Sequence, residues 1–82
     1  MITWKKLFTE ALAENGESFS DVISASITDA EFDVDLHGPN GGDLRMKEFA
    51  VYTGLRVYYP IESMDSDWLF VGSQNRNPTT LP

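Results

Sequence analysis

The chain has 82 residues and no cysteine, which predicts a single domain without disulfides or thiolate metal ligands. Its 13 acidic and six basic residues give a formal net charge of -7, which opposes direct binding to nucleic acid or to a membrane surface. No segment approaches the ~20 apolar residues of a membrane span. We therefore expect a cytoplasmic protein.

The first predicted element is a helix that begins after Thr3, a favourable N-cap residue. Asn15-Gly16 is a typical helix end. Two lysines in the first turn and Glu10 and Glu14 toward the end oppose the helix dipole, at a cost of a few tenths of a kcal/mol per charge. One apolar stripe follows the helical spacing: Trp4, Leu7, Phe8, Ala11 and Leu12.

A second helix is predicted to begin after Ser18, because Ser18 and Asp21 have the spacing of a capping box. Its apolar residues again follow a helical stripe, and it should end near residues 24–26, where serines weaken the helix. A second capping signal at residues 28–31 predicts another helical turn. The apolar stripe of the helix predicted after Ser18 consists of Phe19, Val22, Ile23 and Ile27.

Residues 31–37 fit two structures. Apolar and polar side chains alternate there, which favours a strand with an acidic outer face, whereas the preceding capping signal favours a helix. We expect one helical turn followed by extended chain. Proline and three glycines make residues 38–43 a loop.

The strongest pattern lies between residues 49 and 71 and predicts a three-stranded antiparallel meander. Thr53-Gly54 provides the first reversal, and Pro60 should end the second strand. The expected fold class is α+β, with two short N-terminal helices packed on this meander. Residues 1–74 form the predicted domain and 75–82 a flexible C-terminal tail. The expected strand segments are 49–53, 55–60 and 68–71.

Both faces of the predicted sheet carry apolar side chains. Two short helices can cover only one face, so the other either packs under the N-terminal loops or forms a contact surface for a partner or a second copy. Phe49, Val51, Val57 and Tyr59 are expected on one face, with Tyr52 and Tyr58 on the other.

Charge is distributed unevenly along the chain. No lysine or arginine occurs between Leu7 and Leu44, and this acidic segment should attract basic surfaces, although acidic residues also serve solubility alone. Its nine acidic residues are Glu10, Glu14, Glu17, Asp21, Asp29, Glu31, Asp33, Asp35 and Asp43.

Catalytic and metal-binding patterns are incomplete. Residues 33–38 resemble the start of a calcium loop, but Leu44 stands where a bidentate glutamate is needed. His37 could form an acid/base pair with Asp35 or Asp43, yet no activated nucleophile accompanies it. We expect a non-enzymatic protein without a metal or cofactor.

Five short segments spread over most of the chain form a recognisable pattern: Trp4-Lys-Lys-Leu-Phe8, Thr28-Asp-Ala-Glu-Phe32, Phe49-Ala-Val-Tyr-Thr53, Arg56-Val-Tyr-Tyr-Pro60 and Arg76-Asn-Pro78. This pattern resembles a group of small acidic proteins encoded by tailed bacteriophages and prophages. The loop from His37 to Lys47 departs most from that group. The resemblance implies no activity and no catalytic residues. It implies a phage accessory protein acting inside a bacterial cell.

We therefore predict a protein that binds and occludes a host or phage protein with a basic surface. A more specific form of this hypothesis is a DNA mimic, which requires rows of carboxylates spaced like the phosphates of a DNA backbone. The alternative is a structural or self-assembling phage component that uses an apolar sheet face as an oligomer contact. The expected contact residues are Glu10, Glu14, Glu17, Asp21, Asp33, Asp35, Tyr52 and Tyr58.

Overall fold

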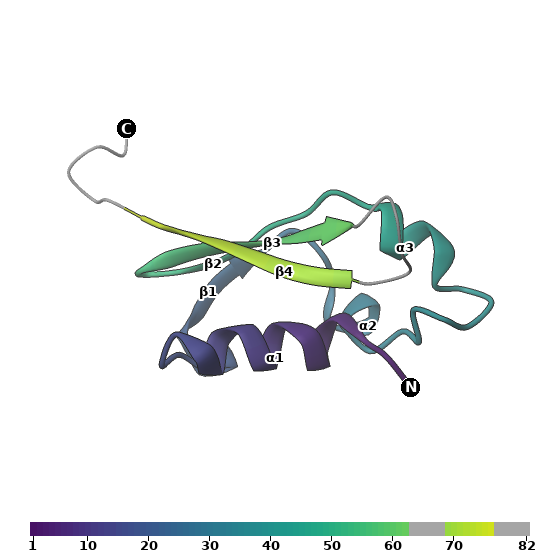
Figure 1. Cartoon of the computed structure of the whole chain (residues 1–82), viewed down its shortest axis with the longest axis horizontal. Coiled ribbons are helices and arrows are strands. Elements are labelled where there is room, and N and C mark those ends of the chain that lie inside the picture. The colour runs from purple at the N-terminus through teal and green to yellow at the C-terminus, as the bar shows by residue number, and fades with distance from the viewer. Residues whose placement is uncertain (63–68, 77–82) are drawn as a thin grey trace.

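The computed structural model describes residues 1–62 and 69–76. It consists of one antiparallel sheet with strand order β1-β2-β3-β4, a long N-terminal helix across one of its faces and shorter helices near one end (Figure 1). The α+β class and the antiparallel sheet are confirmed, but the sheet has four strands, not three. The elements are α1 (Trp4–Glu14), a 3-10 turn (Phe19–Asp21), β1 (Val22–Ala25), α2 (Asp29–Phe32), α3 (Gly42–Met46), β2 (Val51–Thr53), β3 (Arg56–Glu62) and β4 (Leu69–Asn75).

Both ends of α1 are as predicted. The hydroxyl of Thr3 accepts a backbone N–H from the first turn at 3.1 Å. At the other end Gly16 has a φ of 73°, and its N–H donates to the carbonyl of Ala13 while that of Glu17 donates to Leu12, at 3.0 and 2.8 Å. These two bonds satisfy the last helical carbonyls, and only glycine adopts this φ without strain.

The apolar stripe of α1 forms the centre of the core. Trp4, Phe8 and Leu12 are fully buried. The indole Nε1 of Trp4 donates to the carbonyl of Leu44 at 3.1 Å, which joins α1 to α3 and satisfies a buried donor. Edge-to-face and stacked ring contacts connect four aromatic side chains: Trp4, Phe8, Phe32 and Phe49.

The predicted second helix is wrong. Its capping box does form, because the N–H of Ser18 donates to Asp21 at 2.9 Å, but only one 3-10 turn is built on it. The chain then continues as β1, which pairs with β2 so that Val22 lies opposite Thr53. The apolar spacing suits either structure, and β2 supplies long-range backbone partners that decide for a strand.

The helical turn at residues 28–31 is correctly predicted, but the extended chain expected after it is wrong. Thr28 and Glu31 cap α2 reciprocally with bonds of 3.0 and 3.2 Å. Residues 33–37 form turns rather than a strand, and Leu36 is buried, with its N–H donating to the carbonyl of Ile2 at 2.8 Å. The helix α3 begins within the predicted glycine-rich loop.

The hairpin of β2 and β3 reverses at Gly54-Leu55, one residue later than predicted, and the predicted facing of its tyrosines is wrong. Val51 lies opposite Tyr58, and Tyr52 lies opposite Val57. A connection of two residues pairs odd positions of β2 with even positions of β3. Tyr58 therefore shares the face of Val51, and Tyr52 lies on the other face.

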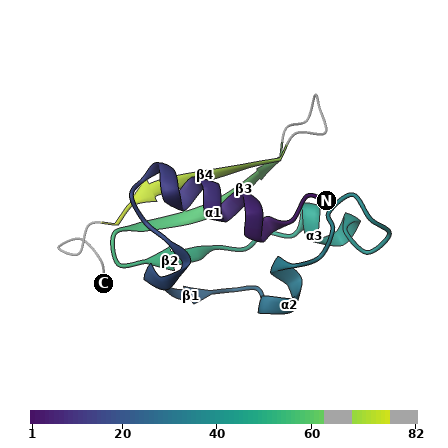
Figure 2. The same cartoon turned by 90° about the horizontal axis from the view of Figure 1, so that it is seen from below.

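The helices α1 and α2 lie on one side of the sheet, here called the inner face, and α3 lies beyond the end of the strands (Figures 1 and 2). The other side is here called the outer face. On it the ring of Tyr59 lies over Gly72, and a Cβ added to Gly72 would lie 2.6 Å from that ring. No described helix covers this face, and several of its side chains are exposed. The apolar members of the outer face are Tyr52, Val57, Tyr59, Ile61 and Phe70.

Pro60 does not end its strand, since β3 continues to Glu62. It is tolerated because β2 begins at Val51, opposite Tyr58. No residue of β2 therefore faces the proline, and no hydrogen-bond donor is missed there.

The last strand is longer than predicted and runs to Asn75. Trp68, which was expected to begin it, lies outside the described residues. Arg76 donates its backbone N–H to Leu55 at 2.8 Å. The first two residues of the expected tail, 75 and 76, are thus attached to the sheet, and residues 77–82 lie outside the described part.

Candidate protein-interaction surface

The predicted acidic contact residues are spread over several elements. Glu10 and Glu14 are exposed on successive turns of α1. Asp21 is exposed in the 3-10 turn and Asp33 is exposed after α2. Asp35 is half-buried and accepts the N–H of residue 37 at 3.1 Å, so it stabilises a turn. Only Glu10 and Glu14 lie together on one element.

Glu17 and Tyr58 are interior residues, and their predicted role as exposed contacts is wrong. The hydroxyl of Tyr58 donates to Oε1 of Glu17 at 2.5 Å, and Nη1 of Arg56 lies 3.5 Å from the same oxygen. Tyr58 is fully buried, and the side chain of Glu17 is 5% exposed. This Glu17–Tyr58–Arg56 cluster joins the end of α1 to β3.

The cluster shifts two pKa values in opposite directions. Burial acts to raise the pKa of Glu17, but hydrogen bonds from Tyr58 and Thr53 and the charge of Arg56 outweigh it, so the pKa falls below 4.5. Burial and the bond to Glu17 raise the pKa of Tyr58. At neutral pH an ionised carboxylate is therefore held by a neutral phenol, which is a structural arrangement.

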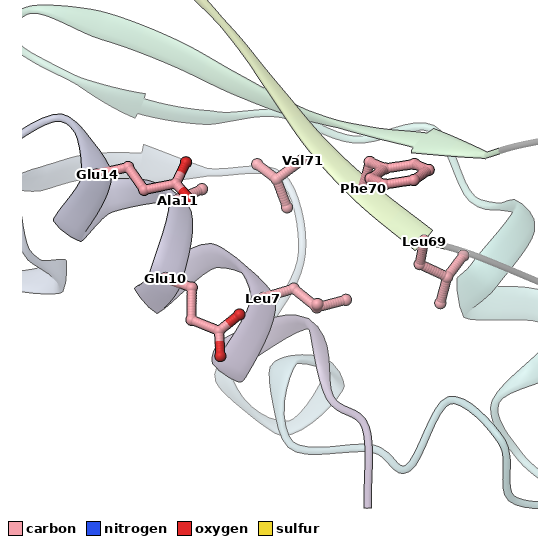
Figure 3. A pocket seen from close by; sticks show the side chains of 7 residues that line it. All are labelled: Leu7, Glu10, Ala11, Glu14, Leu69, Phe70 and Val71. Atoms are coloured by element: carbon pink, nitrogen blue, oxygen red, sulfur yellow. The ribbon is translucent and has the colours of Figure 1, made fainter.

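Glu10 and Glu14 line an open hollow between α1 and β4. Figure 3 shows Leu69 and Val71 of β4 directed toward the helix, with the two glutamates on the helix side. Within residues 1–62 and 69–76, no lysine or arginine forms an ion pair with either glutamate. We call this feature the α1–β4 hollow; it is lined by Leu7, Glu10, Ala11, Glu14, Leu69, Phe70 and Val71.

The hollow combines two kinds of contact. Leu69 and Val71 are half-buried, so an apolar floor is accessible. Phe70 borders the hollow, but its side chain, which is 50% exposed, lies on the outer face. The carboxylates on the wall provide charge. An interface that pairs apolar area with charged groups at the margin is typical of protein–protein recognition.

The sequence did not indicate the β4 side of the hollow. Residues 69–71 were predicted as a strand, and nothing in their spacing places them beside α1. The order of elements gives only a coarse signal, because a helix that precedes a meander is expected to pack across one face of the sheet without indicating which strand it contacts.

Tyr52, the remaining predicted contact residue, lies on the outer face and not at the hollow. It is 38% exposed. The guanidinium of Arg76 lies 5.5 Å from the centre of its ring and donates to the carbonyl of Thr53 at 2.7 Å. The structure therefore has two separate candidate surfaces, the α1–β4 hollow and the outer face.

Neither a metal site nor a membrane span is found in the described part of the chain. No three described His, Asp or Glu side chains are close enough to hold a metal ion. None of the described helices is both long and apolar enough to cross a membrane. The cation of Lys47 pairs with Glu31 at 3.0 Å.

Comparisons of the chain with protein-family models, with curated proteins and with solved structures give no match. A functional interpretation therefore depends on the two surfaces themselves. Of these, the α1–β4 hollow offers both charge and apolar area, whereas the outer face offers apolar area with one cation beside it.

Proposed function

We propose that this chain is a non-enzymatic binding protein of the phage accessory type, which engages and occludes a host or phage protein that presents a basic surface. The supporting observation is that Glu10 and Glu14 form one wall of the α1–β4 hollow. A lysine or arginine of the partner can lay its aliphatic stem along the apolar floor while its charged end pairs with a glutamate.

The acidic charge of the whole chain assists this function. A net charge of -7 accelerates encounter with a basic partner, and this steering weakens as salt shortens the screening length to about 8 Å or less. The phage setting rests on the sequence resemblance alone. We favour occlusion without DNA mimicry, because Glu17 is withdrawn from any surface row of carboxylates.

A pull-down of tagged protein from bacterial lysate tests the proposal. Glu10→Lys with Glu14→Lys reverses the wall of the hollow, and Asp33→Lys with Asp43→Lys makes the same change in net charge at residues elsewhere on the chain. We expect a salt-sensitive partner that is lost with the first variant and kept with the second. Equal retention by both variants, or equal loss, contradicts a specific role for the hollow.

A second candidate function is a self-associating structural component, favoured by the composition of the outer face. In the described strands no acidic residue points to this side. Two copies could therefore meet there with their acidic helices on opposite sides of the assembly, away from one another. The outer-facing strand positions are Ser24, Tyr52, Val57, Tyr59, Ile61, Phe70, Gly72 and Gln74.

Sedimentation equilibrium distinguishes this second function. Self-association through the outer face should survive high salt and be lost on Ile61→Asp. Leu55→Asp is the matched control, because Leu55 is 63% exposed in the turn beyond the face. A chain that stays monomeric at millimolar concentration rules out this candidate.

A further inference from the structure

Among the described strands, β4 is a sheet edge that lacks the usual protections. It pairs with β3 on one side, and no described strand lies on its other side (Figure 1). Natural edges are usually short, bulged, charged or interrupted by proline. The seven residues of β4 contain no charged residue and no proline, and their register with β3 is regular throughout.

The opposite edge, β1, has two of these protections. It has four residues, and its register with β2 shifts between Val22 and Ser24. The two edges therefore differ in their capacity to accept another strand. The open edge is the one beside the α1–β4 hollow.

The backbone groups available at this edge can be deduced from the ladder. Arg76 donates to Leu55 at 2.8 Å, which extends the β3–β4 ladder by one pair. Because antiparallel bonding alternates, Val71 and Ser73 direct their N–H and C=O groups to the open edge. Pro60 lies opposite Val71. Because proline has no N–H to donate, this position agrees with Val71 directing its backbone groups away from β3. The residues that face β3 are Phe70, Gly72 and Gln74.

The side chain of Val71 points to the inner face, toward α1 (Figure 3). A strand added beside it would place every second side chain over the α1–β4 hollow, next to Glu10 and Glu14. We propose that β4 accepts an extended segment of the partner as a fifth strand, with lysine or arginine at alternate positions on the side that faces α1. This inference rests on the proposed function and specifies the chemistry of its partner.

Charge argues for a basic segment and against a second copy of this chain at the edge. Two copies paired through β4 about a two-fold axis would bring Glu10 and Glu14 of both to the same junction. Like charges placed opposite one another disfavour that pairing. A segment with a cation at every second residue would instead place positive charges next to Glu10 and Glu14, which lie four residues apart on α1.

The probe is a blocked eight-residue peptide of alternating lysine and valine, titrated into the full chain at low salt. Hydrogen exchange at single amides, followed by NMR, reports edge pairing directly. We expect the amides of Val71 and Ser73 to exchange fast in the free protein and to become protected on binding. Those of Gly72 and Gln74 are protected in both states. A glutamate–valine peptide of equal length is the control and should not bind.

Ser73→Pro removes one open-edge donor without removing a bond to β3, a position where an edge strand tolerates proline. It should weaken peptide binding about tenfold or more, a factor that corresponds to about 1.4 kcal/mol, while circular dichroism stays unchanged. Ser73→Thr keeps the donor and should bind as the parent chain does.

The results separate the two proposals. Absence of peptide binding at millimolar concentration, or binding without new protection at Val71 and Ser73, overturns the added strand. If the partner from lysate is still lost on reversal of Glu10 and Glu14, the proposed function stands without it. If the double change Glu10→Gln with Glu14→Gln leaves the affinity for the peptide unchanged, the two glutamates do not select a basic segment. That result contradicts both the proposed function and the added strand.

Discussion

The hydroxyl of Tyr58 donates a 2.5 Å hydrogen bond to Oε1 of Glu17, and both side chains are buried where the end of α1 meets β3. Glu17 comes directly after Gly16, whose left-handed backbone reverses the chain after α1. The bond therefore fixes that reversal to the middle of the sheet. Because its acceptor is ionised, it belongs to the stronger class of protein hydrogen bonds.

Replacing Tyr58 with phenylalanine should destabilise the fold. The substitution keeps the ring but leaves a buried carboxylate without its principal donor, which typically costs about 1.5–3 kcal/mol. Urea unfolding measures the difference. Tyr59→Phe is the matched control, because its ring lies on the outer face over Gly72, and its cost should stay within about 0.5 kcal/mol. Similar losses from both variants would contradict the assigned role of the bond.

The same bond predicts an acid-sensitive contribution to stability. Glu17 has a folded pKa below 4.5, so its contribution is fully present above pH 4.5 and is lost as pH falls through the folded pKa. We expect the difference in free energy of unfolding between the parent chain and Glu17→Gln to be largest at neutral pH and to shrink in acid. A difference that is constant from neutral to strongly acidic pH would disprove the linkage.

Local signals in this chain predicted local structure well. The N-cap at Thr3, the stop at Gly16 and the capping box at Thr28 all form. The same signal at Ser18 also forms, yet the chain becomes β1 because β2, far along the sequence, offers pairing partners. Capping residues determine how an element begins, and tertiary partners determine how long it lasts.

The candidate site was less predictable for the same reason. Helical spacing alone places Glu10 and Glu14 on one exposed side of α1. The burial of Glu17 depends on the facing of Tyr58, which in turn depends on a connection of two residues between β2 and β3. One residue more or less in that turn exchanges the two faces of β3. No composition or periodicity fixes such a count.

Gly41 should be intolerant of a side chain. A Cβ at this position would overlap the backbone of Asp35 and Leu36, which cannot move as a flexible side chain would. We expect Gly41→Ala to destabilise the fold by about 1–3 kcal/mol, the usual cost of overpacking. Gly42→Ala is the control, because nothing lies within 4 Å of its added Cβ. Thermal unfolding of the two variants tests this prediction. Equal unfolding midpoints would contradict the close contact between Gly41 and the backbone of residues 35 and 36.

Glu14→Lys should stabilise the protein while removing part of the proposed binding wall. Glu14 is the last residue of α1 and is exposed, so a cation there interacts favourably with the helix dipole by about 0.3–1 kcal/mol. It also replaces a repulsive pair with Glu10 by an attractive one, worth about 0.3 kcal/mol. Glu14→Gln should give a smaller gain, and added salt should reduce both. A lower melting temperature for Glu14→Lys would refute this reasoning. A higher melting temperature together with loss of partner binding would mean that the acidic end of α1 serves recognition at the expense of stability.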